Sequence, residues 1–145
     1  MHRRDWTLLA IASGDAAVTQ PVQLQKALFL LGEKLTPDHL GTEAFYEFTP
    51  YDYGPFSKAV YSDAEALEAE GLVAIRRPPD TRFNLYVATL AGQQRAAELR
   101  GGLSPEASEY LDRLMSWVRS LSFQELVKAI YQSFPEMKAN SVFQE

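Results

Sequence analysis

Few side chains in this sequence have the chemistry of catalysts or metal ligands. The chain contains no cysteine and two histidines, His2 at the N-terminus and His39 after a predicted helix stop. Without cysteine it cannot form a disulfide, a thiolate zinc site, an iron–sulfur cluster or a cysteine nucleophile. Two separated histidines do not make a multi-histidine metal centre. We therefore predict no metal site and no catalytic residue.

The usual sequence motifs of enzymes are also missing. The chain has no Gly-x-Ser-x-Gly, no Gly-x4-Gly-Lys-Ser/Thr, no Gly-x-Gly-x-x-Gly and no EF-hand spacing. Glu65 and Glu68 would share a helix face, but that face has the pattern of a solvated surface. We predict a protein that is not an enzyme and uses no cofactor. A small enzyme would need a deep pocket with buried titratable groups.

Aromatic side chains are crowded into one part of the chain. Seven of the 17 aromatic residues fall between positions 45 and 61: Phe45, Tyr46, Phe48, Tyr51, Tyr53, Phe56 and Tyr61. One interpretation is that they pack helices onto a sheet. The other is a recognition surface, because tyrosines supply rigid amphipathic contact area in interfaces. On such a surface, Tyr51, Asp52 and Tyr53 are the expected exposed residues, whereas Gly54 and Pro55 are structural in either case.

A lysine interrupts an apolar helical pattern just before this cluster. Lys26 follows Gln25 on a helix whose other face is apolar, which predicts that the lysine side chain is exposed and solvated. The alternative is a buried lysine with a partner such as Asp52.

A basic loop is predicted between two strand-like runs. Arg76, Arg77 and Arg82 outnumber the one carboxylate in this turn-rich segment. The helix predicted over residues 55–70 has the opposite sign, with one cation, Lys58, against four carboxylates, so phosphates would repel it. The three arginines therefore have three interpretations: a solvated turn, contact with nucleic acid through its backbone or minor groove, or contact with an acidic protein.

Periodicity places these side chains on a series of short elements. Apolar residues recur at three- and four-residue spacing in the helical segments, and aromatic or β-branched residues mark the strands. The two tryptophans, Trp6 and Trp117, have the spacing of core residues. We predict helices over residues 6–13, 22–35, 55–70, 90–99, 104–120 and 122–134. We also predict a short strand or an extended segment over 45–48, strands over 72–75 and 83–87, a turn over 51–55, and a loosely packed tail over the last ten residues.

The order of these elements predicts an α+β fold, a helix-rich winged helix-turn-helix with a two-stranded wing and two additional C-terminal helices. The 145 residues, 46% hydrophobic with a net charge of −5, suffice for one core. We assign residues 1–100 to the winged-helix core and 101–145 to a helical extension packed on the same domain. The apolar stripe of that extension completes the monomer or forms a homodimer. The apolar runs are too short to span a membrane and the N-terminus is unlike a signal peptide, so we expect a cytoplasmic protein.

Several motifs resemble those of known families. One part of the chain resembles winged-helix proteins. It consists of the run Glu70-Gly71-Leu72-Val73, a predicted hairpin, and then the pattern Tyr-x-x-Thr-x-x-Gly from Tyr86 to Gly92. The stretch from Leu24 to Phe29 and the turn Tyr53-Gly54-Pro55-Phe56 with Val60-Tyr61 resemble the Panacea (SocA-like antitoxin) superfamily. Nearly the whole chain is similar to the YwgA-type prokaryotic proteins of uncharacterised role, through the run from Tyr51 to Ser57, the run from Leu126 to Tyr131, Phe134-Pro135 and Asn140-Ser141. The C-terminal third departs from the antitoxin branch.

The resemblance to the antitoxins implies a non-enzymatic protein that binds a partner, neutralises a toxin or presents it to a protease, and it draws attention to Gln25 and Lys26. We therefore expect a binding and regulatory module that contacts a protein of unknown identity. The predicted protein-binding residues are Gln25, Lys26, Tyr51, Asp52, Tyr53 and Phe56.

The alternative is a DNA-binding transcriptional regulator that uses mainly the wing, through Arg76, Arg77 and Arg82. A continuous positive stripe joining these arginines to Arg3 and Arg4 would favour DNA. An acidic face beside an exposed aromatic patch would favour a protein partner.

Overall fold

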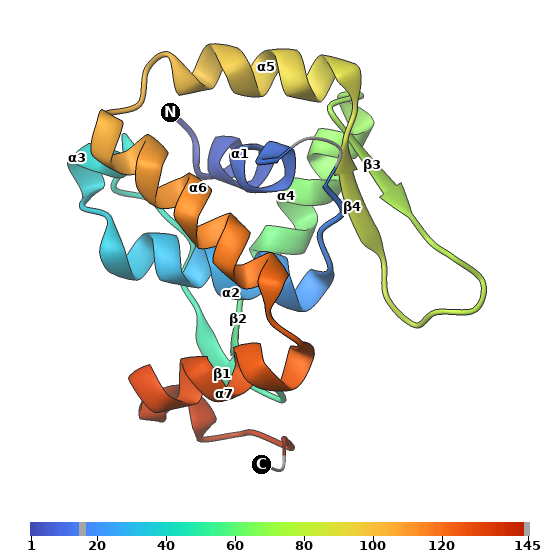
Figure 1. Ribbon diagram of the computed structural model, residues 1–145, viewed down its shortest axis with the longest axis vertical. Coiled ribbons are helices and arrows are strands. Elements are labelled where there is room, and N and C mark those ends of the chain that lie inside the picture. The colour runs from blue at the N-terminus through green and yellow to red at the C-terminus, as the bar shows by residue number, and fades with distance from the viewer. Residues whose placement is uncertain (15–16, 144–145) are drawn as a thin grey trace.

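The computed structural model describes residues 1–14 and 17–143. Within this part of the chain the fold is α+β, with seven α-helices, two separate two-stranded antiparallel sheets and a short 3-10 helix, η1 (Figure 1). The helices are α1 (Arg3–Ala12), α2 (Pro21–Lys34), α3 (Pro37–Leu40), α4 (Lys58–Ala69), α5 (Leu90–Arg100), α6 (Pro105–Ser120), α7 (Phe123–Ser133) and η1 (Pro135–Lys138). The strands are β1 (Thr49–Tyr51), β2 (Gly54–Phe56), β3 (Val73–Arg76) and β4 (Leu85–Ala88).

Helix α1 lies at the centre of the molecule. Every residue from Trp6 to Ala12 is buried, and α2, α4, α5 and strand β4 all contact this helix. Its apolar composition on all sides explains this position, because such a helix must be covered on every face. The indole of Trp6 donates a hydrogen bond of 2.8 Å to the carbonyl of Leu40. The prediction that this tryptophan belongs to the core is confirmed.

A buried polar network connects α1 to α4. The hydroxyl of Tyr46 donates to a carboxylate oxygen of Asp63 at 2.6 Å, and it lies 2.7 Å from the hydroxyl of Thr7. Arg3 pairs with the same carboxylate at 3.1 Å and lies over the Tyr46 ring. Burial, together with donation to Asp63, raises the pKa of Tyr46 far above its usual range. Tyr46 therefore keeps its proton and acts as a donor within the core.

Replacing Tyr46 with phenylalanine is expected to lower the free energy of unfolding by about 1–2 kcal/mol, because the partly buried carboxylate of Asp63 and the buried hydroxyl of Thr7 each lose a partner. Chemical denaturation at pH 7 measures the change. Tyr110→Phe is the matched control, because the side chain of Tyr110 is only partly buried. Equal stability of Tyr46→Phe and the wild type would show that the network contributes nothing.

Arg119 joins the C-terminal helices to the end of α1. Its guanidinium donates to the carbonyls of Ser13, Ala10 and Ile11 and to the hydroxyl of Thr19. These carbonyls lie at the C-terminus of α1, where the helix offers them no N–H donors of its own and where a cation is favoured. Helix α6, which carries Arg119, also packs on α2, so the C-terminal helices are held on two earlier elements.

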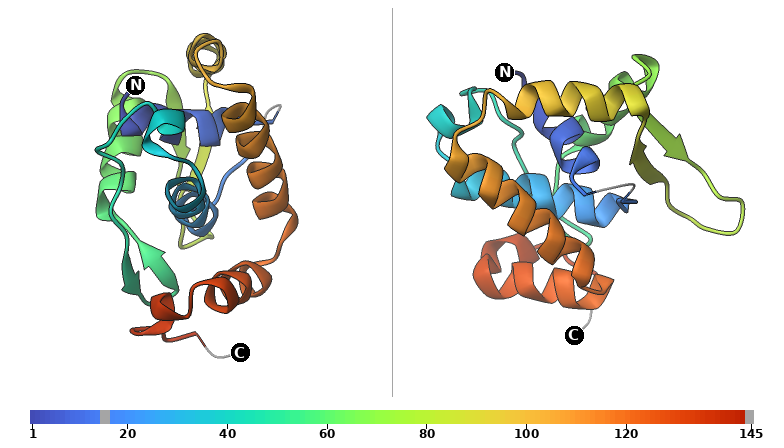
Figure 2. Two further views of the ribbon diagram at one scale, coloured as in Figure 1. Left: turned by 90° about the vertical axis from the view of Figure 1, so that its left-hand side faces the viewer. Right: turned by 45° about the horizontal axis from the view of Figure 1, so that its top comes forward.

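Two hairpins leave the helical body in different directions (Figures 1 and 2). The β1–β2 hairpin, with Pro50 paired to Pro55, reaches α7 and the C-terminal end of the described chain. The β3–β4 hairpin pairs Val73 with Ala88 and projects from the side of the molecule. An isolated bridge between Thr19 and Tyr86 joins the segment before α2 to β4.

Of the two alternatives predicted for residues 45–48, the structure does not have the strand, because their rings pack on one another and on α2: Phe48 against Phe29 at 5.6 Å and Phe45 against Gly32. Two other local predictions are wrong. The first strand comes later, at Thr49–Tyr51, and the next helix starts at Lys58 because Pro55 belongs to β2. The last residues described, up to position 143, are not a loosely packed tail, since η1 packs against β1. Residues 144–145 lie outside the described part.

The prediction that Trp117 is a core residue is also wrong. Its side chain is 41% exposed and lines a shallow groove with Leu30, Tyr110 and Leu114. The core face of α6 is formed instead by residues such as Met115 and Val118, which are fully buried. No helix in the described ranges combines the length and apolar character that crossing a membrane requires.

Candidate functional site

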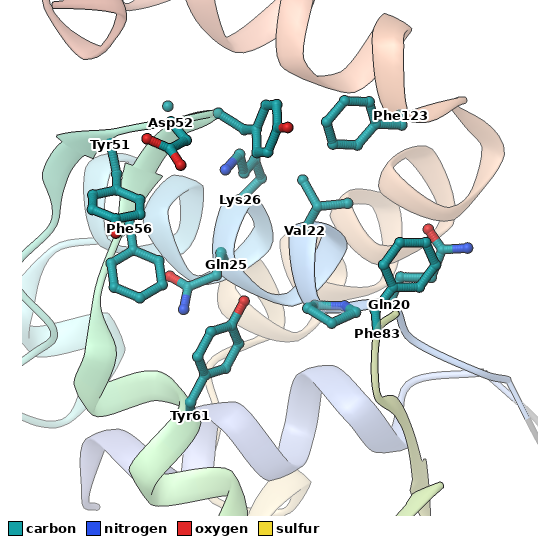
Figure 3. Close-up of a pocket in the computed structure, with 13 residues that line it drawn as sticks. Gln20, Val22, Gln25, Lys26, Tyr51, Asp52, Phe56, Tyr61, Phe83 and Phe123 are labelled. Atoms are coloured by element: carbon teal, nitrogen blue, oxygen red, sulfur yellow. The ribbon is translucent and has the colours of Figure 1, made fainter. Parts of the chain in front are cut away.

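One cavity of about 440 Å³ lies between the start of α2, the β1–β2 hairpin, α4 and the loop before β4 (Figure 3). Most of its wall is apolar, and aromatic rings come from four different elements or loops. The lining residues are Gln20, Pro21, Val22, Gln25, Lys26, Tyr51, Asp52, Tyr53, Gly54, Phe56, Tyr61, Phe83 and Phe123.

The cavity brings together the six residues that the sequence singled out for protein binding. Gln25 and Lys26 come from α2, and Tyr51, Asp52, Tyr53 and Phe56 come from the β1–β2 hairpin, about 25 to 30 positions later in the chain. Val22, Tyr61, Phe83 and Phe123 belong to the same wall but were not expected. Their elements meet only in the folded chain, and the spacing of apolar residues along each element carries no sign of that meeting.

Lys26 is buried, and the prediction that it is exposed is wrong. The β1–β2 hairpin covers this face of α2, so only 4% of the residue is accessible. Its ammonium donates to the carbonyl of Pro55 at 3.3 Å. Among the described residues no carboxylate lies within 4.0 Å of it, so the pairing with Asp52 is not formed. Burial lowers the pKa of Lys26 from 10.5 to about 8.

Gln25 is buried as well, at 2% exposure, and its side chain holds the backbone that forms part of the cavity wall. Its amide nitrogen donates to the carbonyl of Ser57 at 2.9 Å, and its amide oxygen accepts from the backbone N–H of Ser57 at 2.9 Å. The side chain thereby satisfies both backbone groups of the residue between β2 and α4. We conclude that Gln25 positions the cavity wall and does not present a free amide to a ligand.

The rim of the cavity is aromatic and open to solvent. Tyr51 is 53% exposed and stacks on Phe56, with ring centroids 4.9 Å apart. Tyr53 is 44% exposed and meets the edge of Phe123 at 5.0 Å. Phe83, in the loop before β4, is also exposed. Large exposed aromatic residues that share one concave surface are uncommon on a protein face without a partner.

The C-terminal segment holds the turn that carries this rim. The backbone N–H of Val142 donates to the carbonyl of Asp52 at 2.9 Å, and the amide of Asn140 donates to the carbonyl of Pro50 at 3.2 Å. The hydroxyl of Tyr131 donates to the hydroxyl of Ser141 at 2.6 Å. Periodicity does not indicate this support, because the polar residues after position 138 lack any periodic pattern.

Gly54 explains the sharpness of the turn. Its φ of +99° lies in the left-handed region, and an added Cβ would approach the Tyr131 ring to 3.2 Å. A glycine is therefore required on both conformational and steric grounds.

The predicted nucleic-acid-binding arginines are not among the residues that line this cavity. Arg77 approaches Glu68 at 3.5 Å and donates to the carbonyl of Ile75. Arg3 and Arg4, which would extend a positive stripe, pair with Asp63 at 3.1 Å and Glu70 at 3.0 Å. Arg76 and Arg82 lie on the β3–β4 hairpin without joining the cavity lining. The carboxylates of α4 thus interrupt the stripe that DNA binding through the wing would need.

The described ranges contain no cluster of three or more histidine, aspartate or glutamate side chains arranged to hold a metal ion.

In comparison with known proteins, the chain matches no family model and no curated protein. Its function is therefore inferred from the cavity and from the charges around it.

Proposed function

We propose that this protein is a non-catalytic binding and regulatory module that contacts a protein partner through the aromatic cavity. The observation that carries the proposal is the convergence of exposed Tyr51, Tyr53 and Phe83 around one apolar hollow. Tyrosines around a desolvated pocket are typical of the residues that dominate interface energies. An antitoxin-like role is the form of this function that the resemblance of Leu24–Phe29 and Tyr53–Phe56 supports.

We further propose that the architecture is a winged helix-turn-helix with two added C-terminal helices. Helix α4, the left-handed Gly71 and the β3–β4 hairpin occur in the order of a recognition helix and a wing. In this interpretation the recognition helix is acidic and forms ion pairs with α1 and the wing. That charge supports a protein partner over a DNA-binding regulator that acts through Arg76, Arg77 and Arg82.

Affinity capture from a lysate of the source organism tests the proposed function. The wild type should retain a defined protein that is lost with Tyr51→Ala/Tyr53→Ala and that is indifferent to nuclease. Leu90→Ala is the matched control, because Leu90 is exposed and apolar but lies outside the cavity. The captured protein is then purified and mixed with the chain to confirm direct contact. Recovery of nucleic acid that requires Arg76, Arg77 and Arg82 and survives the tyrosine changes would contradict the proposal.

A further inference from the structure

We infer that the cavity recognises an acidic side chain of the partner next to an apolar one, with Lys26 as the cation that pairs with the carboxylate. The inference rests on the proposed function, because it specifies the chemistry of the segment that the same cavity binds. Nothing in the resemblance or in the sequence motifs assigns a charge to that segment.

The first argument is the unmatched charge of Lys26. An ammonium has three N–H donors, and the carbonyl of Pro55 accepts one hydrogen bond from it. No carboxylate of the described residues is within ion-pair distance of this amine, although the residue is almost fully buried. A buried charge is costly unless an opposite charge compensates it. A carboxylate delivered by a ligand would supply that compensation.

The second argument is the place of this charge in the cavity. Figure 3 shows the amine of Lys26 on the side of the β1–β2 hairpin, with Val22 beside it on α2 and Phe123 further from the hairpin, all three on the cavity wall. A ligand with an apolar group against Val22 and Phe123 would bring an adjacent acidic group toward Lys26. The volume of about 440 Å³ is sufficient for one aromatic ring and a short acidic side chain.

Among the described residues, Asp52 is the one carboxylate on the cavity wall, and its charge opposes an acidic ligand. Its side chain is exposed, so water screens its charge far more than it screens that of buried Lys26. The neighbouring hydroxyls of Tyr51, Tyr53 and Tyr61 can serve as hydrogen-bond donors. Within the hollow, the lysine therefore sets the preference for the charge of a ligand.

Blocked dipeptides test this preference directly. Ac-Phe-Glu-NH2, Ac-Phe-Gln-NH2 and Ac-Phe-Lys-NH2 are titrated into the intact isotope-labelled chain, and NMR shifts of the Val22, Lys26 and Gly54 amides report binding. We expect Ac-Phe-Glu-NH2 to bind about tenfold more tightly than Ac-Phe-Gln-NH2 and the lysine peptide most weakly, because an ion pair in a desolvated site exceeds a neutral hydrogen bond. The affinities themselves are expected near the millimolar range of fragment-sized ligands.

Two variants connect the preference to Lys26. Lys26→Met should reduce the Glu-to-Gln ratio to about one while leaving the binding of Ac-Phe-Gln-NH2 in place. Lys34→Met, on the last turn of the same helix and outside the cavity, should keep the tenfold ratio. Circular dichroism confirms that both variants are folded.

The remaining outcomes overturn the inference in distinguishable ways. Equal binding of the Glu and Gln peptides would refute the recognition of a carboxylate but leave the cavity as an apolar binding site. Tighter binding of the Lys peptide would assign the charge preference to Asp52. If no peptide shifts the cavity amides, the inference fails, while a partner lost with Tyr51→Ala/Tyr53→Ala would still support the proposed function.

Discussion

Lys26→Met is expected to be more stable than the wild type at pH 7, by about 2 kcal/mol. The wild-type ammonium is buried with a single carbonyl partner, and burial lowers its pKa from 10.5 to about 8. That difference corresponds to a burial cost of roughly 3 kcal/mol at neutral pH. Methionine has a similar volume and no charge. The loss of the hydrogen bond to Pro55 reduces the gain in the free energy of unfolding by about 1 kcal/mol.

The stability difference between Lys26→Met and the wild type should depend on pH in a defined direction. Below about pH 8 the lysine is protonated in both the folded and the unfolded chain, so the full cost is present. Between about pH 8 and 10.5 the folded chain loses this proton first and the unfolded chain binds more protons, so the wild type gains stability as the pH rises. The advantage of the variant should therefore disappear by about pH 10.

Denaturant unfolding of both proteins at pH 7 and pH 10 measures this change, and other titrating groups cancel in the difference. A variant that is less stable at pH 7, with a difference independent of pH, would show that the ammonium is stabilised in the free protein. In that case Lys26 would have no unmet charge to offer a ligand.

Gly92→Ala is expected to destabilise the protein by roughly 3–4 kcal/mol, because the chain packs closely at this position. A Cβ on Gly92 would lie 1.9 Å from the carbonyl oxygen of Leu72. That oxygen already accepts from the backbone N–H of Thr89 at 3.1 Å, and the Thr89 hydroxyl accepts from the N–H of Gly92 at 3.0 Å. The start of α5 would have to move away from Leu72, the residue before β3, and break the bond between Thr89 and Leu72.

Thermal and chemical unfolding of Gly92→Ala test this packing. Gly102→Ala is the control, since a Cβ there meets its nearest atom at an ordinary 3.6 Å. The control should stay within about 0.5 kcal/mol of the wild type, as is usual for exposed positions. A Gly92→Ala protein as stable as the control would mean that α5 lies further from Leu72 than the structure shows.

The sequence predicted most elements because their signals are local. The predicted helices over residues 22–35 and 104–120 agree with the structure to within a residue, since Pro21 and Pro105 occupy first turns and apolar spacing continues to the last turn. Residues 45–48 could not be assigned to a strand or to an extended segment from the sequence, because aromatic residues favour strands and helix-packing loops alike. Here the rings are buried against α2, which no local pattern indicates.

The residues of the candidate site were predicted, but their burial and their contacts were not. The six residues were chosen from the aromatic crowding and from a resemblance, and the structure places all of them on one cavity. Lys26 was expected in solvent because polar residues on an amphipathic helix normally face water, and no prediction was made of the burial of its neighbour Gln25. A hairpin formed 25 to 30 residues later covers them, and burial that arises from such distant contacts cannot be inferred from the helix alone.

The affinity of the purified chain for its captured partner is the most direct test of the cavity as the binding surface. We expect Tyr51→Ala/Tyr53→Ala to weaken binding at least about thirtyfold, as the loss of two central tyrosines does in other interfaces. Arg76→Ala/Arg77→Ala/Arg82→Ala should remain within about threefold of the wild type, as is typical of charges at a rim. Binding that survives the tyrosine changes and fails with the arginine changes would contradict the assignment and place the functional surface on the β3–β4 hairpin.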